Sequence, residues 1–334
     1  MLLMRKLILL ITGFGSALVA MSQTSSLVSY GQQDPQFSQY ALSPAMFNPA
    51  ATGVGEAWVS SLLIRSQWVG LPGAPVSQDL TSHVPVYKLN SGAGIHVTNI
   101  TAGEQRLTTV SAAWSYHKRF GGATLSAGLS GGMLQYSLNG DKLITPTGTY
   151  GDVVDHNDPN LPVTLMTKVI PDAAAGIYFF TDDLQVGVSA NHVLLPLWSD
   201  NAPADATVQY NPNAYVYVAY GFDAGLRFRI MPNVLYKTDL NAGVVDVNTL
   251  VTYDNRLMAG ISARAGVQGT FDAISLMAGV HVADKWQISY AYDITLSELN
   301  TVSSGSHEIG IRYSIPVARP RAGKMINNPR FLYH

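Results

Sequence analysis

The run KWQISYAYDI, residues 285–294, decides the fold class because large apolar side chains occupy every second position. Successive side chains of a β-strand point to opposite faces, so the run predicts a strand with one apolar face. That face carries Trp286, Ile288, Tyr290, Tyr292 and Ile294. The other face carries Lys285, Gln287, Ser289 and Asp293.

Three further runs, residues 125–135, 184–191 and 309–315, alternate in the same way. Each sets mainly apolar side chains on one face against small or polar ones on the other. A transmembrane barrel shows this pattern, with the apolar face in lipid and the polar face in the lumen. A soluble β-sandwich would show the same alternation, but with the apolar face buried and the polar face exposed to water. The export signal and the low charge described below favour the barrel.

About fourteen such segments follow one another, each roughly ten residues long, which is enough to span a bilayer when tilted. They lie near residues 57–67, 76–87, 92–100, 106–119, 122–136, 170–180, 184–193, 213–221, 223–236, 243–253, 256–265, 271–281, 285–294 and 306–316. Bacterial barrels have an even number of strands. We therefore predict an all-β fold, a transmembrane antiparallel β-barrel, with an N-terminal periplasmic or plug segment and a short C-terminal periplasmic tail.

The composition agrees with a membrane barrel. Of 334 residues, 47% are hydrophobic and 13% are charged, whereas soluble domains average about 25% charged residues. After the N-terminus no stretch approaches 18 uninterrupted apolar residues, so helical membrane spans are not expected. Cysteine is absent, which excludes disulfides, thiolate zinc sites and cysteine nucleophiles.

Residues 1–22 have the pattern of a cleaved signal peptide. Arg5 and Lys6 form a basic segment, Leu7–Ala20 is a short apolar core, and Ala20-Met21-Ser22 is a small-x-small cleavage site. A membrane anchor would need about 20 apolar residues. Arg5 and Lys6 account for two of the 20 basic residues, which leaves 18 against 22 acidic ones. No basic patch suggests nucleic acid as a partner.

The connections between the segments alternate in length. Those at one end, such as 138–169 and 194–212, are long, whereas those at the other end, such as 120–121 and 253–255, are short. Bacterial barrels carry long extracellular loops and short periplasmic turns. We therefore expect residues 138–169 outside the cell and both chain ends in the periplasm.

Residues 33–53, QDPQFSQYALSPAMFNPAATG, do not fit the strand pattern. Their prolines are Pro35, Pro44 and Pro49, and their large apolar residues are Phe37, Tyr40, Met46 and Phe47. The prolines prevent one continuous helix or interior strand. The aromatic residues are too apolar for a free linker, since burial of a Phe-sized side chain contributes roughly 1.5–3 kcal/mol. The segment is either an arm that packs on a neighbour or a plug that closes the barrel from the periplasmic side or docks a periplasmic partner.

The same string resembles the start of the PorP/SprF family, outer-membrane proteins of the type IX secretion system in gliding and related bacteria. The matching residues are Gln33, Asp34, Pro35, Gln36, Phe37, Ser38, Gln39, Tyr40, Asn48, Pro49, Ala50 and Gly53. A second match is RSQWVGLPGAP at 65–75, and a third combines GSHEI at 305–309 with PRFL at 329–332. The family often has Cys before the closing Pro-Arg-Phe, where this chain has Asn328. The matches extend over nearly the whole mature chain.

The resemblance implies an outer-membrane accessory component that supports secretion or surface attachment of large adhesins, including gliding adhesins whose C-terminal domain is of the second type. The implied partners are outer-membrane lipid, the adhesin or its C-terminal domain, and periplasmic ring or translocon proteins. A core component that links the membrane to periplasmic ring lipoproteins is an alternative, and a porin or solute channel is another. We expect no cofactor and no enzymatic activity, since no convergent catalytic triad is evident.

The expected organisation is a signal peptide (1–22), an arm or plug (23–55), the barrel (56–316) and a periplasmic tail (317–334). The expected partner-binding or plug residues are Asp34, Pro35, Gln36, Phe37, Ser38, Gln39, Tyr40, Asn48, Pro49, Arg65, Gln67, Trp68, Pro72, Gly73, Pro75, Pro329, Arg330 and Phe331. The expected lumen charges are Arg256, Arg264, Asp293, Glu308 and Arg312. Such charges form a network that fixes register or, alternatively, line a selective pore.

Two other polar groups have plain interpretations. His307 and Glu308 are adjacent on a predicted strand and so point to opposite faces, which argues against a shared catalytic relay. The loop GDVVDHNDPN carries Asp152, Asp155, His156 and Asp158. Calcium binding is conceivable there, but a polar surface loop with Asp-Pro turns is favoured.

Overall fold

The computed structural model describes residues 34–151, 154–158, 161–194, 211–239, 241–267, 271–283 and 285–319. The predicted signal peptide (1–22) and most of the predicted tail, including Pro329, Arg330 and Phe331, lie outside the described residues. No helix among the described residues is long and apolar enough to cross a membrane.

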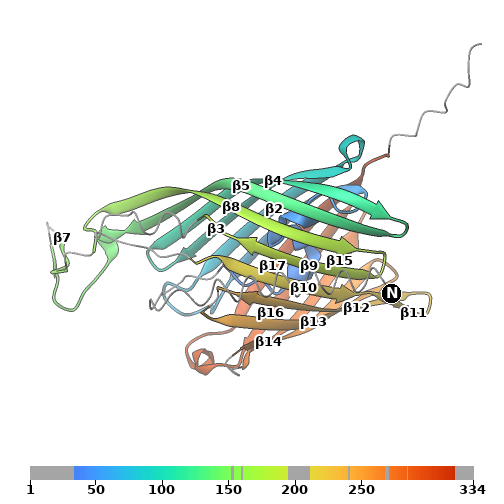
Figure 1. The fold of residues 1–334 in the computed structure, drawn as a ribbon. Helices are drawn as coiled ribbons and strands as arrows, with labels where there is room; N and C mark the ends of the chain where they lie inside the picture. The colour runs from blue at the N-terminus through green and yellow to red at the C-terminus, as the bar shows by residue number, and fades with distance from the viewer. Residues whose placement is uncertain are drawn as a thin grey trace, which may run out of the picture.

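Fourteen antiparallel strands form the wall of a closed barrel (Figure 1). They are β1 (Ala57–Ser66), β2 (Val76–Val86), β3 (Ser91–Ala102), β4 (Gln105–Phe120), β5 (Ala123–Asn139), β8 (Leu165–Phe180), β9 (Leu184–Asn191), β10 (Asn213–Tyr220), β12 (Phe228–Thr238), β13 (Gly243–Tyr253), β14 (Leu257–Gly266), β15 (Phe271–Val282), β16 (Trp286–Thr295) and β17 (Ser306–Pro316). Each wall strand pairs with its neighbours in the chain, and β1 pairs with β17. The predicted fourteen-stranded barrel is confirmed.

Two strand boundaries differ from the prediction. The segment 223–236 is not one strand, because β11 (Phe222–Ala224) folds back on the start of β12. Gly225 lies in this turn with φ +77°, a conformation that glycine adopts without strain. Strand β8 begins at Leu165 rather than near 170, because it pairs with β5 as far as Asn139. A short β6–β7 pair (Thr149–Tyr150 and Val154–Asp155) lies in the connection between β5 and β8.

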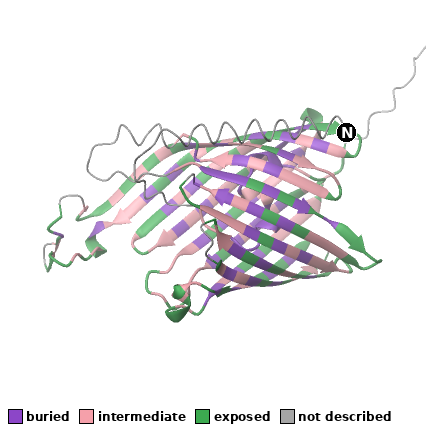
Figure 2. Cartoon of the chain, turned by 60° about the horizontal axis from the view of Figure 1, so that its bottom comes forward, coloured by how far each residue is buried: buried purple, intermediate pink, exposed green. Residues whose placement is uncertain are grey.

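The two faces of the wall follow the predicted alternation (Figure 2). On β5, outward Leu129 and Met133 are 67% and 63% exposed, whereas inward Ser126 is fully buried. On β16, outward Trp286 and Ile288 are exposed and inward Asp293 is buried. The exposed apolar side chains thus form the surface that a transmembrane barrel presents to lipid.

Arginine at position 131 is expected to destabilise the barrel more than arginine at position 130. Gly131 points outward into open space, where a lipid-facing arginine costs about 2–4 kcal/mol near mid-depth. Ser130 lines a cavity inside the barrel, where water can solvate the guanidinium. Urea unfolding of Gly131→Arg and Ser130→Arg in lipid vesicles measures the difference. Equal losses of stability would contradict the face assignment.

The two ends of the barrel differ in their connections. At the end called here the turn end, strands are joined by residues 87–90, 121–122, 181–183, 221–227, 254–256 and 283–285. At the opposite end, called the loop end, the connections are residues 67–75, 103–104, 140–164, 192–212, 239–242, 267–270 and 296–305. The predicted asymmetry in length is present. That the loop end faces the outside of the cell stays a prediction.

Candidate functional site

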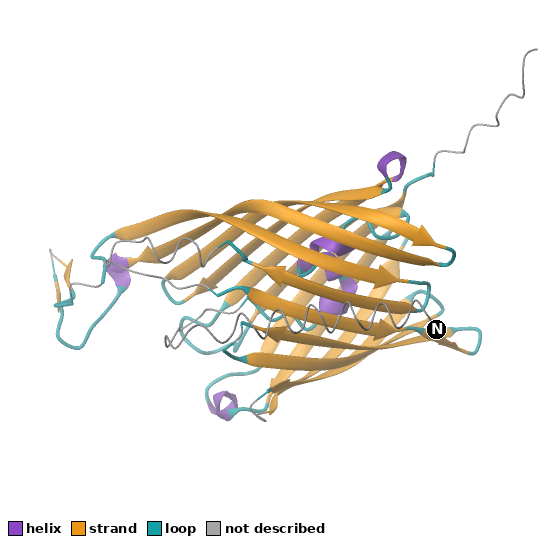
Figure 3. Ribbon diagram, viewed as in Figure 1, coloured by secondary structure: helices purple, strands orange, loops and turns teal. Residues whose placement is uncertain are grey.

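An arm formed by residues 34–55 runs through the barrel lumen (Figure 3). It contains three single-turn 3-10 helices, η2 (Tyr40–Leu42), η3 (Pro44–Met46) and η4 (Pro49–Ala51). A proline opens η3 and another opens η4. Proline suits the start of a helix, because it has no N–H that would stay unpaired there and its φ fits the first turn. The prolines therefore produce the compact, broken course that fits inside the barrel.

The arm extends from the loop end to the turn end. Asp34 contacts residues at the loop-end termini of β9 and β12, and Gly53 contacts the turn-end part of the wall through His83. The expectation that the segment closes the barrel from the periplasmic side or docks a periplasmic partner stays a prediction, because it depends on which end of the barrel faces the periplasm. The arm occupies the length of the lumen.

Small inward residues make room for the turn-end half of the arm. A Cβ on Gly128 would lie 2.4 Å from the backbone nitrogen of Ala50, so only glycine permits this approach. Serine hydroxyls of the wall donate 2.6 Å hydrogen bonds to arm carbonyls, Ser126 to Ala50 and Ser189 to Phe47. The side chains of the wall thus supply the hydrogen bonds that the irregular arm backbone lacks.

Asn48 joins the arm to two strands at once. Its side-chain oxygen accepts a bond from the Ala50 nitrogen at 2.9 Å, as an N-cap does. Its side-chain nitrogen donates to the carbonyls of Ile177 and Val188, on β8 and β9, at 3.1 and 3.3 Å. Asn48 is 1% exposed, so the predicted plug role of this residue has a structural basis.

Aromatic side chains of the arm pack on tyrosines of the wall. The Phe47 ring stacks on Tyr215 with 5.7 Å between centroids, and Tyr40 meets Tyr217 edge to face at 6.2 Å. Tyr40, Phe47 and Tyr217 belong to one buried cluster. Aromatic pairs in these geometries contribute about 0.5–1.5 kcal/mol beyond their buried area, which helps to retain the arm in the lumen.

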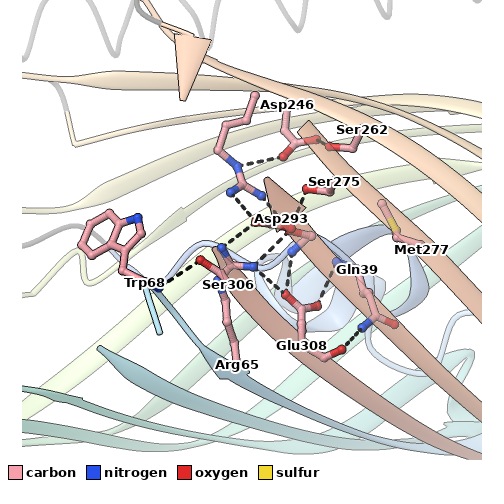
Figure 4. A network of polar contacts seen from close by, with 12 residues as sticks. Gln39, Arg65, Trp68, Asp246, Ser262, Ser275, Met277, Asp293, Ser306 and Glu308 are labelled. Atoms are coloured by element: carbon pink, nitrogen blue, oxygen red, sulfur yellow. Dashed lines mark hydrogen bonds and ion pairs between the residues drawn. The ribbon is translucent and has the colours of Figure 1, made fainter. Parts of the chain in front are cut away.

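A buried cluster of charges surrounds Ser38 of the arm. The lumen cluster, as we call it, comprises Arg65, Asp246, Arg264, Asp293 and Glu308. In Figure 4, Arg65 lies between Asp293 and Glu308. Arg65 lies 2.6 Å from Asp293 and 3.2 Å from Glu308. Arg264 lies 3.0 Å from both Asp246 and Asp293.

The arm completes the hydrogen bonding of this lumen cluster. The Ser38 hydroxyl donates to Asp293 and accepts from Arg65 and Arg264. The backbone nitrogens of Ser38 and Gln39 donate to the two carboxylate oxygens of Glu308, at 2.8 and 3.0 Å. Buried charges are tolerated only when they are paired and hydrogen-bonded. The bonds of the lumen cluster are therefore complete only when Ser38 and Gln39 lie at this position in the lumen.

A second group of polar residues binds Asp34, the first described residue of the arm. His192 lies 2.8 Å from the Asp34 carboxylate and 2.9 Å from Asp172 on β8. Tyr215 donates to the other Asp34 oxygen, and Lys237 donates to the Asp34 carbonyl at 2.6 Å. His192 lies just beyond the end of β9 and has a left-handed backbone conformation, with φ +60°.

The ionisation of this group is set by its contacts. Burial alone would lower the pKa of His192, but the Asp34 charge and the hydrogen bonds to Asp172 and Asp34 raise it to about 10. Burial alone would raise the pKa of Asp34, but the His192 charge and the bonds from His192 and Tyr215 hold it well below its usual range. Each group thus favours the charged form of the other.

We expect His192→Gln to reduce the dependence of thermal stability on alkaline pH. Because folding raises the pKa of His192, its charged form stabilises the fold fully at pH values below 6.5, the ordinary pKa of histidine. This contribution is lost as the pH rises through about 10. The lowered pKa of Asp34 acts oppositely, so its contribution is present above 3.8 and is lost in acid. Melting midpoints between neutral and strongly alkaline pH measure the effect. Parallel curves for the two proteins would contradict it.

The arm also forms the floor of a vestibule, a cavity of about 540 Å³ at the loop end. Asp34, Pro35 and Gln36 lie at its floor, and Gln67 and Trp68 from the β1–β2 connection lie in its wall. Its remaining lining comes mainly from the loop-end residues of β12 to β17. The vestibule is therefore bounded by segments from both ends of the chain.

The β1–β2 connection is bonded to the start of β17. The Trp68 nitrogen donates to the Ser306 hydroxyl at 3.1 Å, and the Val69 nitrogen donates to the Gly305 carbonyl at 2.8 Å. In return, the Ser304 nitrogen donates to the Val69 carbonyl at 2.7 Å. Trp68 is partly buried and lines the vestibule, so it is not a lipid-facing girdle residue.

A family model for the type IX secretion system membrane protein PorP/SprF matches residues 29–313. The chain belongs to the PorP/SprF family. Three of the sequence stretches that carried the resemblance are the arm, the β1–β2 connection and GSHEI at the start of β17, whereas PRFL at 329–332 lies outside the described residues. In this PorP/SprF protein these three meet around the vestibule and the lumen cluster.

The chain is similar to several solved structures, of which the toluene transporter TbuX supports the barrel fold. The toluene transporter TbuX of Ralstonia pickettii is 11% identical, with a TM-score of 0.50 over 82% of this chain and 93% of that one. The monoaromatic hydrocarbon channel CymD is 10% identical, with a TM-score of 0.45 over 82% and 98%. Omp33 of Acinetobacter baumannii is 10% identical, with a TM-score of 0.43 over 78% and 99%. No curated protein matches the sequence.

Most of the residues expected at the site of this PorP/SprF protein lie in the arm or at the vestibule. Phe37, Ser38, Gln39, Tyr40, Asn48 and Pro49 are buried in the lumen, and Arg65, Gln67, Trp68 and Pro75 line the vestibule. Pro72 and Gly73 are exposed at the tip of the β1–β2 connection. Pro329, Arg330 and Phe331 lie outside the described residues and stay predictions.

The prediction of lumen charges needs one correction. Arg264, Asp293 and Glu308 form the lumen cluster with Arg65, and Arg312 donates to the Leu42 carbonyl of the arm at 3.1 Å. Arg256 is not a lumen charge. It is exposed in the turn between β13 and β14, where the alternation of a strand no longer directs the side chain.

Several site residues were not anticipated from the sequence. Asp172, His192 and Lys237 bind the start of the arm, and Asp246 completes the lumen cluster. Asp172 and Asp246 stand at inward positions of predicted strands, so the alternation rule could have marked them as lumen charges. The alternation did not mark His192, because the predicted strand 184–193 placed it on the same face as Leu184 and Val186, whereas β9 ends at Asn191.

His307 and Glu308 have separate partners, and His156 of the loop GDVVDHNDPN is bonded within that loop region. Glu308 is buried in the lumen cluster, whereas His307 contacts Tyr290 at 2.6 Å on the opposite face, as the alternation predicts. His156 is buried among loop residues and contacts the Pro162 carbonyl. Among the described residues no group of three or more His, Asp or Glu side chains is arranged to hold a metal ion, and Asp152 lies outside those residues.

Proposed function

We propose that this PorP/SprF protein supports secretion or cell-surface attachment of a large adhesin, and that the adhesin or its C-terminal domain binds at the vestibule. The convergence of the three family stretches around one vestibule carries the proposal. A wall that served only as a membrane anchor would not need the Trp68 connection bonded to β17 beside the arm. The proposal includes export through a cleaved signal peptide and contact with the type IX machinery.

The filled lumen argues against a plain porin. Arm residues from Phe37 to Thr52 are largely buried, and they bond to strands around the circumference, including β5, β9, β13 and β17. A diffusion channel needs an open lumen instead. The exposed loop end and its vestibule offer binding surface, which suits a protein that holds a partner rather than one that passes solutes.

Vestibule variants are expected to lower adhesin display without lowering the amount of folded barrel. Trp68→Ala and Gln36→Ala remove side chains that line the vestibule and lie outside the lumen cluster. Surface immunolabelling of the adhesin, alongside the barrel's heat-modifiable gel shift, measures display and folding separately. Leu129→Ala, on the lipid-facing wall, is the matched control.

The outcomes separate the candidate roles. Loss of display for one client, with other type IX clients still secreted, supports the accessory role. Loss of every type IX client would assign a core role in the machinery instead. Unchanged display in both vestibule variants would refute the vestibule as the binding site.

A further inference from the structure

Three basic side chains lie close together at the turn end of the barrel. Lys88 belongs to η5 (Tyr87–Leu89), the single 3-10 turn between β2 and β3. Lys118 and Arg119 belong to the last residues of β4, which ends at Phe120. All three basic side chains are exposed. We call Lys88, Lys118 and Arg119 the basic patch.

Contacts between η5 and the end of β4 hold the basic patch together. The Arg119 guanidinium lies over the Tyr87 ring, 6.0 Å from its centroid. The His117 nitrogen donates to the Asn90 carbonyl at 2.6 Å. Residues that flank Lys88 thus contact both chain neighbours of Lys118, so the three positive charges share one small area of the surface.

The basic patch has no acidic residues in the strand ends around it. The stretches 84–94 and 114–128, which form the turn ends of β2 to β5, contain no Asp or Glu. Glu56 reaches this area, but it pairs with Arg319 beside the Tyr87 ring. Within the described part of the chain, no residue of the basic patch forms an ion pair with a carboxylate. The area therefore has a local excess of three positive charges.

Charge of both signs is mixed in other connections of the turn end. Arg229 pairs with Asp183 and Asp223, and Asp182 and Asp254 are exposed in the turns that follow β8 and β13. The unpaired positive charge is thus concentrated over β2 to β5. A uniform coat of surface charge would not show this separation.

The basic patch lies at the edge of the lipid-facing surface. Toward the turn end, the outward residues of β4 are in turn Trp114, Tyr116, Lys118 and Phe120. The three aromatic rings are exposed, and such rings mark the interface between lipid and water in membrane barrels. The Lys118 ammonium lies 5.4 Å from the centroid of the Phe120 ring, on the same outer face.

The level of Lys118 matches that of lipid headgroups. Two residues advance about 6.8 Å along a strand, which is roughly 5 Å along the membrane normal at the tilt of barrel strands. Lys118 therefore stands one such step beyond the Tyr116 ring. Because aromatic belts lie at headgroup level, the ammonium reaches the layer that contains the lipid phosphates.

We propose that the basic patch binds the phosphate groups of anionic phospholipids in the membrane leaflet at the turn end. Lys118 points across the lipid-facing surface rather than along the barrel axis into water, which favours a lipid over a protein partner. Near an anionic membrane surface, each basic residue strengthens binding about fivefold. The inference goes beyond the proposed function and holds whichever end of the barrel faces the periplasm.

The first test counts the lipids that bind to the full-length protein, by native mass spectrometry. The protein in detergent micelles is titrated with dioleoylphosphatidylglycerol, which is anionic, or with dioleoylphosphatidylcholine, which has no net charge. We expect the first phosphatidylglycerol to bind about tenfold more tightly or better. Equal binding of the two lipids would overturn the proposal.

Charge-removal variants show where the anionic lipid binds. The patch variant combines Lys88→Gln, Lys118→Gln and Arg119→Gln. The matched control removes three exposed positive charges elsewhere at the turn end, with Arg227→Gln, Arg256→Gln and Lys285→Gln. We expect only the patch variant to lose the preference for phosphatidylglycerol, with folding checked by the heat-modifiable gel shift. Equal losses in the two variants would refute the basic patch as the site.

A charge-preserving variant separates charge from other effects of substitution. It combines Lys88→Arg, Lys118→Arg and Arg119→Lys, and it should keep the preference for phosphatidylglycerol. A loss as large as that of the patch variant would contradict recognition of phosphate by charge.

An acidic protein segment is the rival occupant of the basic patch. Its probe is fluorescent decaglutamate, added to the full-length protein in detergent micelles. We expect no saturable binding of this peptide. Saturable binding that the patch variant abolishes, together with equal binding of the two phospholipids, would assign the basic patch to a protein partner instead.

Discussion

Replacement of Arg65 by alanine is expected to lower the free energy of unfolding by about 3–5 kcal/mol, the range for breaking a buried ion pair. Arg65 is 2% exposed and bonds to both Asp293 and Glu308. Its removal leaves three buried carboxylates, those of Asp246, Asp293 and Glu308, with Arg264 as the remaining cation of the lumen cluster. The hydrogen bonds from Ser38 and Gln39 cannot offset a missing charge.

The matched control is Arg229→Ala. Arg229 also bonds to two acidic residues, Asp183 and Asp223, at 3.1 Å, but its side chain is 38% exposed. Exposed ion pairs contribute about 0–1 kcal/mol, so this variant should unfold close to the wild type. Urea titration in vesicles measures both. A loss for Arg65→Ala no larger than that of Arg229→Ala would show that the lumen cluster is hydrated and weakly coupled.

Deletion of residues 33–53 is expected to convert a closed barrel into a conducting one. The wall should still fold, because its ladder begins at Ala57 and closes through β1–β17 and β10–β12 without the arm. Loss of the arm empties the lumen, and water then solvates the charges that Ser38 and Gln39 had bonded. Single-channel recording in planar bilayers should show discrete steps for the variant and none for the wild type.

The heat-modifiable gel shift verifies that the deletion variant is folded before its conductance is interpreted. A folded variant that stays closed would mean that other segments block the lumen and that the arm is only packing. A wild-type protein that already conducts would contradict the filled lumen directly. Glu308→Gln offers an intermediate case, since it keeps the arm's length but weakens its bonds to the wall.

Local patterns predicted the wall well. On β16, Trp286, Ile288 and Tyr290 lie on the exposed face as the alternation requires, because the direction of a strand side chain depends only on its position in the strand. The same rule separated His307 from Glu308. It failed at Arg256, which lies in a turn, and at 223–236, where Gly225 reverses the chain.

The path of the arm was only partly predictable. Its prolines and aromatics indicated a buried, non-strand segment, and Phe37, Tyr40 and Phe47 are indeed buried. Its direction through the lumen and its bonds at Asp34 were not evident, since His192 and Lys237 are more than 150 residues away in the chain. A single sequence contains no signal for such distant contacts.

The sequence by itself determined the number of wall strands, which faces meet lipid, and that residues 33–53 lie outside the wall. These properties follow from local periodicity and from the restricted backbone of proline. Only the tertiary structure decided that Ser38 meets Asp293 and Glu308, and that β8 pairs with β5 over a longer stretch than with β9. Both depend on how the strands are staggered when the barrel closes, because closure sets which distant residues reach the same level of the lumen.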